Sequence, residues 1–237
     1  MPNQALFIFE GTLKDFLSSS EKTVAFDFLG NPSVKDAIEA QGVPHVEVTE
    51  ILINQNPVPL SYKLQSGDEI QVYPYSPKHW SSILKNPIKF IVDGHLGKLA
   101  KALRTLGFDS IYDKDYQEQT IANISQNENR FILTRSLHLL KLNKVEWGYW
   151  IRSQEPGEQI EEVLNYFALR NQIQAFTRCR ICNGLIEPVN KDKIIDQLPP
   201  LIKANFDEYF QCKNCQKVYW KGSHYEKMEA FVRSIKG

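Results

Sequence analysis

Two Cys-x-x-Cys motifs near the C-terminal end constrain this chain more than any other feature. Cys179-Arg-Ile-Cys182 and Cys212-Lys-Asn-Cys215 hold all four cysteines of its 237 residues. Each motif places two thiolates on a tight turn, and two such turns that face each other complete a tetrahedral zinc site. The 29 residues between the motifs exceed the usual spacing of about 15 to 20, so this proline-containing segment is expected to loop out. The pattern predicts a zinc ribbon over residues 178–237.

The four cysteines allow a second interpretation, which is two disulfides. The chain shows no signal peptide and no surplus cysteine, and this favours zinc in a reducing compartment. A site closed by Cys179, Cys182, Cys212 and Cys215 leaves no position for water, so the zinc would stabilise the fold and catalyse nothing. No apolar run reaches the length of a membrane span. We therefore expect a soluble cytoplasmic protein without a membrane partner.

Charge is unevenly distributed along the chain, although the net charge is zero. Residues 1–88 hold six Lys/Arg against ten Asp/Glu, residues 89–177 hold eleven of each, and residues 178–237 hold eleven against seven. A basic C-terminal segment is compatible with nucleic-acid binding, although many domains with other functions carry such a surplus.

The first part of the chain has the pattern of a small sheet with one helix. A helix is predicted to begin after Ser33, its N-cap, and to end at Gly42. Strands are predicted at residues 5–13, 24–28, 46–53 and 69–73, with a polar break at 18–22 after the first. This order predicts a ubiquitin-like β-grasp domain over residues 1–76.

Part of this domain, from Ile51 to Val72, resembles the sulfur-carrier proteins of molybdopterin and thiamin synthesis. Those carriers act through a free C-terminal Gly-Gly. Here the last strand continues into Tyr73-Pro-Tyr-Ser-Pro77, so carrier chemistry is excluded. The domain is expected to bind a protein partner or to act as a scaffold.

Residues 77–88 are predicted to be a linker, and strands and helices alternate after it. Strands are predicted at 89–93, 110–112, 130–134 and 147–152, and helices at 96–106, 118–125 and 158–170. The alternation predicts a parallel α/β domain over residues 89–177, with its site at the carboxyl ends of the strands.

Two carboxylates stand where such a sheet places its site. Asp93 ends the first strand of this domain, and Glu118 begins the next predicted helix. Carboxylates are the hard ligands that Mg²⁺ or Mn²⁺ requires, and paired metals would activate water and stabilise a phosphodiester transition state. Alternatively, both residues cap helices, as acids at helix starts often do.

Basic residues near these acids are candidates for binding the phosphates of a substrate. Arg135 follows a later predicted strand, and Lys98, Lys101 and Arg104 share a face of the predicted helix 96–106. Guanidinium and ammonium groups form charge-assisted hydrogen bonds with phosphate oxygens.

The order of motifs after residue 89 resembles the Mut-seven C-terminal ribonuclease family. The resemblance begins in the segment from Phe90 to Asp109 and continues through Arg130-Phe-Ile-Leu-Thr-Arg135, the cysteine motifs and Tyr219-Trp-Lys-Gly-Ser-His224, followed by Met228. That family is described as a PIN-like nuclease domain with a zinc ribbon, and some members carry a ubiquitin-like domain in front. The resemblance implies a metal-dependent ribonuclease that hydrolyses RNA with magnesium or manganese, and Asp93 matches the first acid of the family.

This chain departs from the family pattern at two further acidic positions. Glu118 stands where the family usually has Asp, and Thr134-Arg-Ser136 stands where the family motif reads Thr-Arg-Asp. A hydroxyl is a neutral and weaker ligand than a carboxylate, so Asp113, Asp115 or His138 would have to compensate for Ser136. If none does, the chain is a catalytically weakened RNA-binding or adaptor protein.

The segment after the second cysteine motif combines aromatic and basic residues. Tyr219 and Trp220, with Lys217 and Lys221, would form a surface that stacks bases and binds phosphates of single-stranded RNA. The alternative is that Tyr219 and Trp220 pack the ribbon against its neighbour. His224 is a candidate phosphate contact or proton shuttle at the nuclease site. DNA as the substrate stays open, because phosphate contacts do not distinguish the sugars.

Overall fold

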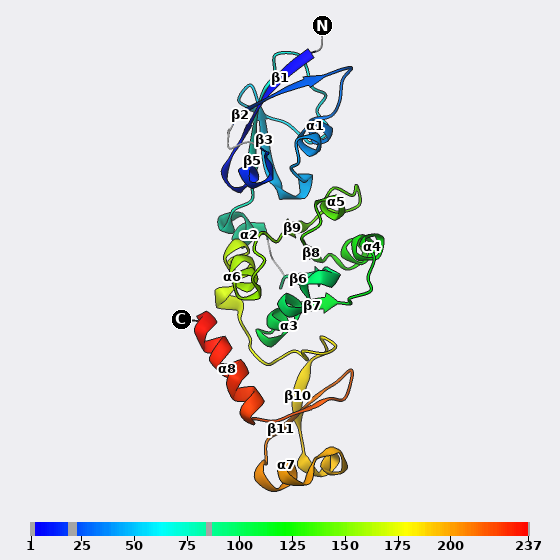
Figure 1. Ribbon diagram of the computed structural model, residues 1–237, viewed down its shortest axis with the longest axis vertical. Helices are drawn as coiled ribbons and strands as arrows, with labels where there is room; N and C mark the ends of the chain where they lie inside the picture. Colours follow the sequence, from blue (N-terminus) through cyan, green and yellow to red (C-terminus); the bar gives the residue numbers. More distant parts are fainter. Residues whose placement is uncertain (1–2, 19–22, 84–86, 237) are drawn as a thin grey trace. The chain divides into compact units, whose positions relative to one another are not determined.

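The computed structural model describes residues 3–18, 23–83 and 87–236 (Figure 1). Its internal contacts divide the chain into two compact units. Unit 1 consists of residues 1–83 and 118–150, and unit 2 of residues 84–117 and 151–237. Residues of the predicted α/β domain therefore fall in both units, and the predicted bounds of the three domains and the linker stay predictions. The predicted break at 18–22 and the linker at 77–88 lie in part outside the described residues.

A five-stranded mixed sheet forms the first part of unit 1, in the order β2-β1-β5-β3-β4. The strands are β1 (Asn3–Phe9), β2 (Thr23–Phe28), β3 (Val48–Ile53), β4 (Asn56–Pro57) and β5 (Glu69–Pro74). β1 pairs with β5 in parallel, and the pairs β1–β2, β3–β5 and β3–β4 are antiparallel. With helix α1 (Val34–Ala40) following the β1–β2 hairpin, this topology confirms the ubiquitin-like β-grasp fold.

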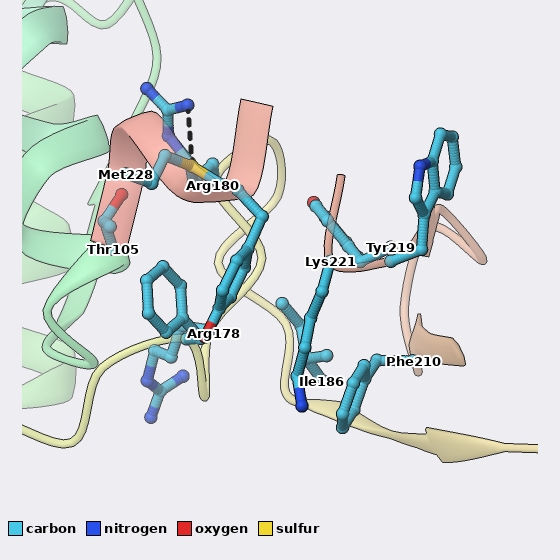
Figure 2. Close-up of a pocket in the computed structure, with 11 residues that line it drawn as sticks. Thr105, Arg178, Arg180, Ile186, Phe210, Tyr219, Lys221 and Met228 are labelled. Carbon is cyan, nitrogen blue, oxygen red and sulfur yellow. Dashed lines mark hydrogen bonds between the residues drawn. The ribbon is translucent and has the colours of Figure 1, made fainter. Parts of the chain in front are cut away.

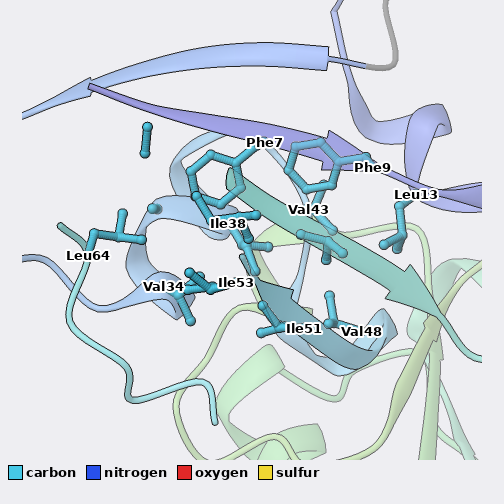
Figure 3. Packing of buried hydrophobic residues seen from close by; sticks show 14 of the residues in the cluster. Phe7, Phe9, Leu13, Val34, Ile38, Val43, Val48, Ile51, Ile53 and Leu64 are labelled. Carbon is cyan, nitrogen blue, oxygen red and sulfur yellow. The ribbon is translucent and has the colours of Figure 1, made fainter. Parts of the chain in front are cut away.

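Alternating side chains of β1 supply the core of this fold. Phe7 and Phe9 are fully buried and pack with residues of α1 such as Val34 and Ile38 (Figure 3). The helix begins as predicted, because the Ser33 hydroxyl accepts the N–H of Asp36 at 3.1 Å and the Asp36 carboxylate accepts the N–H of Ser33 at 3.3 Å. This reciprocal capping box satisfies two amides that the helix cannot satisfy internally.

Two predicted strands of this fold are shorter than the sequence pattern indicates. The prediction of a strand to residue 13 is wrong beyond Phe9, because Gly11 has a φ of +53° and the 3-10 helix η1 (Gly11–Phe16) follows. The strand predicted from residue 46 begins at Val48, after the 3-10 helix η2 (His45–Glu47). A left-handed backbone ends an extended strand, and glycine adopts it without steric cost.

The predicted linker contains a helix and a buried tryptophan. Helix α2 (Pro77–Ile83) carries Trp80, which is 1% exposed. The Trp80 ring stacks on Tyr75 with 4.4 Å between centroids and meets Phe131 edge-on at 5.4 Å. This segment therefore packs within unit 1.

The second part of unit 1 alternates helices and strands. It consists of α4 (Glu118–Glu128), β8 (Phe131–Thr134), α5 (Leu137–Leu140) and β9 (Gly148–Trp150). β8 and β9 pair in parallel, and all four residues of β8 are buried. A parallel pair with intervening helix is the predicted α/β pattern.

Side chains from the β-grasp fold contact this second part directly. Glu47 is 0% exposed, and its Oε1 accepts the N–H of Trp150 at 2.6 Å. His45 Nε2 lies 3.0 Å from the carbonyl oxygen of Val145. Gly148 also lies close to Val46: a Cβ added there would lie 3.5 Å from the Val46 side chain. The β-grasp fold is thus packed against α5 and β9 by buried polar contacts.

Replacing Glu47 by alanine is expected to lower the free energy of unfolding by about 1–3 kcal/mol, because the buried Trp150 amide loses its acceptor. The midpoint of urea unfolding of the intact chain measures this. Glu50, an exposed residue of the neighbouring strand, is the matched control, and Glu50→Ala is expected to change stability by less than about 0.5 kcal/mol. Equal shifts for the two variants would contradict the role of Glu47.

Unit 2 contains the remaining parallel strands and a three-stranded ribbon. β6 (Lys89–Val92) pairs in parallel with β7 (Asp109–Tyr112). Between them lie the 3-10 helix η3 (Gly94–Leu96) and α3 (Gly97–Thr105), whose Leu99 and Leu103 are buried as the helical spacing predicted. Helix α6 (Pro156–Tyr166) and the 3-10 helix η4 (Arg170–Gln172) follow, and both parallel pairs confirm the predicted α/β class.

The ribbon has antiparallel strands in the order β10-β11-β12, formed by β10 (Ile186–Val189), β11 (Tyr209–Cys212) and β12 (Val218–Tyr219). The long segment between the cysteine motifs folds into η5 (Lys191–Lys193), η6 (Ile195–Gln197) and α7 (Pro200–Asn205), around a small core of Ile194, Leu198 and Tyr209. Helix α8 (Ser223–Lys236) ends the described chain. Among the described residues, no helix combines the length and apolar character that crossing a membrane requires.

Candidate functional site

The four cysteine thiols converge in the ribbon. Their sulfur atoms all lie within 4.8 Å of one another, with 3.6 Å between those of Cys179 and Cys215 and 3.4 Å between those of Cys182 and Cys212. Sulfurs about 2.3 Å from a tetrahedral zinc would stand about 3.8 Å apart. The described cysteines form no disulfide. The donor set therefore fits a metal such as zinc, which these four residues would hold.

Local backbone geometry forms the two knuckles in the same way. Each ends on a residue with positive φ directly after its second cysteine, Asn183 at +68° and Gln216 at +60°. The N–H of Asn183 donates to the carbonyl of Cys179, and the N–H of Gln216 donates to the carbonyl of Cys212. The tight turn that the Cys-x-x-Cys spacing predicted is thus closed by a hydrogen bond in both motifs.

Burial and hydrogen bonds act in opposite directions on the protonation of the four thiols. Burial raises the pKa of Cys182, Cys212 and Cys215. Burial acts in the same direction on Cys179, but hydrogen bonds from the Tyr219 hydroxyl, at 3.0 Å, and from backbone amides outweigh it and lower its pKa to about 7. A coordinated metal would remove the remaining protons, since thiolates bound to a divalent cation are deprotonated outright.

Arg104 was predicted to bind substrate, and its surroundings correct that prediction. Its side chain is 3% exposed, and Nε donates to the carbonyl of Ser110 at 2.7 Å. Nη1 donates to the carbonyls of Arg180 and Ile181 at 3.1 and 2.9 Å. Arg104 therefore holds the first cysteine knuckle against α3 and β7. Backbone carbonyls occupy its Nε and Nη1 donors, which are then not available to a phosphate.

A compact hydrogen-bonded cluster surrounds Glu118 at the start of α4. The Ser136 hydroxyl donates to Glu118 Oε1 at 2.5 Å, and His138 Nδ1 lies 2.6 Å from Oε2. Burial favours the neutral carboxyl, but the hydrogen bonds from Ser136 and His138 prevail and lower the pKa of Glu118. Both oxygens of the carboxylate are therefore held in place and ionised at neutral pH.

Ser136 has a structural role in addition to this contact. Its hydroxyl oxygen accepts the N–H of Leu139 at 3.2 Å and so caps α5. Its own N–H donates to the hydroxyl of Thr134 at 2.9 Å. The residue at the position of the missing family acid thus connects the end of β8 to α4 and α5.

Asp93 follows β6 in unit 2 and is partly buried. It occupies the N-cap position of η3, but its side chain makes no capping hydrogen bond there, so the structure does not support capping of this helix as its role. Asp113 and Asp115 are exposed in the turn after β7, where the Asp113 carboxylate accepts the N–H of Asp115 at 3.0 Å. Arg135 is exposed after β8 in unit 1.

The predicted substrate-binding residues of unit 2 differ in their surroundings. Lys98 and Lys101 are exposed on α3. Lys221 forms an ion pair with Glu208 at 2.7 Å. Trp220 is half-buried and packs partly against the small ribbon core, as the packing alternative proposed.

Trp220 also lines a cavity of about 510 Å³ in unit 2, which we call the ribbon groove. The groove extends from α3 to the start of α8, and the lining residues used below are Lys101, Arg180, Trp220, His224, Tyr225 and Met228. The sequence pattern assigned no role to Arg180. The only signal was its place in a Cys-x-x-Cys turn, where intervening side chains cannot face the metal.

Comparison with protein families gives two matches along the chain. Residues 88–232 match the Mut7-C RNAse domain, and residues 3–79 match the Mut7-C ubiquitin domain. No curated protein matches the chain. These matches confirm the family that the motif order predicted.

Two solved structures from Haloferax volcanii are similar to part of the chain. One is described as the crystal structure of SAMP1, with 21% identity over 30% of this chain and 93% of that chain, at a TM-score of 0.25. The other, described as small archaeal modifier protein 1, has 20% identity over 30% of this chain and 97% of that chain, at a TM-score of 0.26.

The match to residues 88–232 covers more than half of the sequence, and the chain therefore belongs to the Mut7-C RNAse domain family.

Proposed function

We propose that this protein is a metal-dependent ribonuclease that hydrolyses RNA phosphodiester bonds. Asp93 and Glu118 are its acidic residues for Mg²⁺ or Mn²⁺, and Arg135 contacts phosphate. His224 is a further phosphate contact or proton shuttle. The match of residues 88–232 to an RNAse domain supports this class of reaction.

The observation that carries the proposal is that the Glu118 carboxylate is ionised and held in a fixed orientation by Ser136 and His138. An ionised carboxylate with a lowered pKa and a fixed orientation is suited to a hard divalent cation. The hydrogen bonds from Ser136 and His138 leave lone pairs on both carboxylate oxygens. Such an oxygen can bind a metal without reorganising, and the metal would activate water and stabilise the charge that develops on the phosphate.

A second candidate function is an RNA-binding or adaptor protein with a weakened metal site. Ser136 favours it, because its hydroxyl proton is donated to Glu118 and its oxygen caps α5. This residue contributes no negative charge where the family motif has an acid. The β-grasp fold would then serve as the surface for a protein partner.

The distinguishing experiment measures cleavage of a labelled single-stranded RNA as Mn²⁺ is added. Wild-type protein is expected to require the metal, and Glu118→Gln is expected to lower kcat/KM by at least about 100-fold, the equivalent of about 2.7 kcal/mol. Glu146→Gln, an exposed glutamate of the same unit, is the matched control and should retain wild-type activity. Metal-independent cleavage, or full activity of Glu118→Gln, would refute the proposal.

The same assay includes Ser136→Asp, which restores the family acid. Aspartate caps helices as well as serine does, so α5 should be retained. If wild-type protein binds RNA without cleaving it and Ser136→Asp cleaves, the adaptor function is correct for the natural chain.

A further inference from the structure

The charge of the ribbon groove limits what can occupy it. Its lining includes four residues that carry or can acquire positive charge, namely Lys101, Arg180, Lys217 and His224, and among the described lining residues there is no aspartate or glutamate. No carboxylate pairs with Lys101, Arg180 or Lys217 in the described parts of the chain. A concave site with one sign of charge attracts a ligand of the opposite sign. The groove is therefore suited to an anion.

Arg180 has unused hydrogen-bonding capacity in this groove. Its Nη1 lies 3.3 Å from the sulfur of Met228 (Figure 2) and 3.2 Å from His224 Nε2, and its Nε is buried without a hydrogen-bond partner. A thioether is a weak acceptor, and a guanidinium carries five N–H donors in a fork that matches phosphate. Nη1 thus holds the arginine in position, while its Nη2 group donates to none of the described residues.

Aromatic rings line the same space. Trp220 and Tyr225 are half-buried and border both the ribbon groove and an adjoining hollow of about 120 Å³, which Figure 2 shows. Tyr225 is supported by Phe176, whose ring centroid lies 4.7 Å away. Partly exposed rings beside cationic groups bind nucleotides, because bases stack on the rings while phosphates meet the cations.

From these observations we propose that the ribbon groove binds single-stranded RNA. A phosphate pairs with the Arg180 guanidinium and with Lys101, and an unpaired base stacks on Trp220 or Tyr225. Single strands fit this combination because a duplex keeps its bases stacked inside the helix. The inference rests on the proposed function, since the groove would hold the substrate of that nuclease.

Binding is tested without added Mg²⁺ or Mn²⁺, by the fluorescence anisotropy of a labelled single-stranded RNA. The double substitution Lys101→Gln with Arg180→Gln is expected to raise Kd at least about 30-fold. It should also reduce the slope of log Kd against log salt by about 0.7, because the two side chains pair with one phosphate and each phosphate contact to a single strand contributes about 0.7. A change in slope separates lost phosphate contacts from a general loss of structure.

The matched control is Lys213→Gln. Lys213 follows the first cysteine of the second knuckle, as Arg180 does in the first, but it pairs with Glu187 and borders neither cavity. Its substitution should leave Kd within about twofold, and all variants should retain one zinc per chain. An unchanged Kd and salt slope in the zinc-loaded double variant would overturn the proposal.

Two competitors separate the ligand classes. A duplex of the same sequence should bind at least about tenfold more weakly, and an oligoglutamate peptide should not displace the RNA. Equal affinity for the duplex, or displacement by the peptide, would overturn binding of single-stranded RNA. This binding test does not depend on cleavage. If the groove binds RNA but the protein never cleaves it, the nuclease proposal is refuted and the groove proposal stands. If the double variant cleaves RNA with an unchanged KM and binds it with an unchanged Kd, the groove proposal is refuted and the nuclease proposal stands.

Discussion

Replacing Cys212 by serine is expected to abolish stoichiometric zinc binding and to unfold the ribbon. The four sulfurs lie within 4.8 Å of one another. Among the described residues, the adjacent cluster has three buried members, Ile194, Leu198 and Tyr209, and the hydrophobic residues packed against it are only partly buried. So small a core does not stabilise a fold alone, whereas a structural zinc contributes on the order of 10 kcal/mol. Chelation of the wild-type protein should have the same effect.

Zinc content and hydrogen exchange of the ribbon amides measure this prediction. Cys212→Ser should lose protection over residues 178–219, while the β-grasp fold of unit 1 retains its own. A reducing agent should leave the wild-type protein unchanged, since the four described cysteines form no disulfide. Lys213→Gln, next to the substituted ligand, should keep one zinc per chain. Full zinc content in Cys212→Ser, or destabilisation of wild-type protein by the reductant, would contradict the zinc site.

Asp93→Asn is expected to lower RNA cleavage by at least about 100-fold without unfolding the protein. Asparagine keeps the shape of the side chain and removes the negative charge, and the stabilisation that a metal gives a phosphoryl transition state amounts to several kcal/mol. Because Asp93 makes no capping hydrogen bond to η3, the neutral side chain should leave that helix intact.

Single-turnover rates at several Mn²⁺ concentrations test this expectation, with thermal unfolding recorded in parallel. The control is Asp196→Asn, an exposed aspartate of the same unit, which should cleave at the wild-type rate. Equal rates for Asp93→Asn and wild-type protein would assign the cleavage to another site. A partial recovery of Asp93→Asn at high Mn²⁺ would support metal binding as its role, since weaker binding is overcome by mass action.

Short-range patterns account for what the sequence determined by itself. Ligand spacing identified the four-cysteine cluster, strand alternation and helical spacing identified the α/β elements, and Ser33 identified the start of α1. Within each cysteine motif, strand, helix and cap, these patterns depend on residues only a few positions apart, whose geometry is fixed by backbone stereochemistry. The order of such motifs was also sufficient to predict the family.

Contacts between distant residues were decided only by the tertiary structure. Arg104 lies on the basic face of its helix in the sequence, yet its guanidinium meets carbonyls 76 and 77 residues away. Glu47 meets an amide 103 residues away, and Ser136 meets Glu118 across 18 residues. Sequence spacing does not encode such partners, because which side chain becomes buried beside which backbone group depends on how the finished elements pack. The zinc ribbon was therefore predictable from the chain, whereas the roles of Arg104, Arg180 and Ser136 followed from the fold.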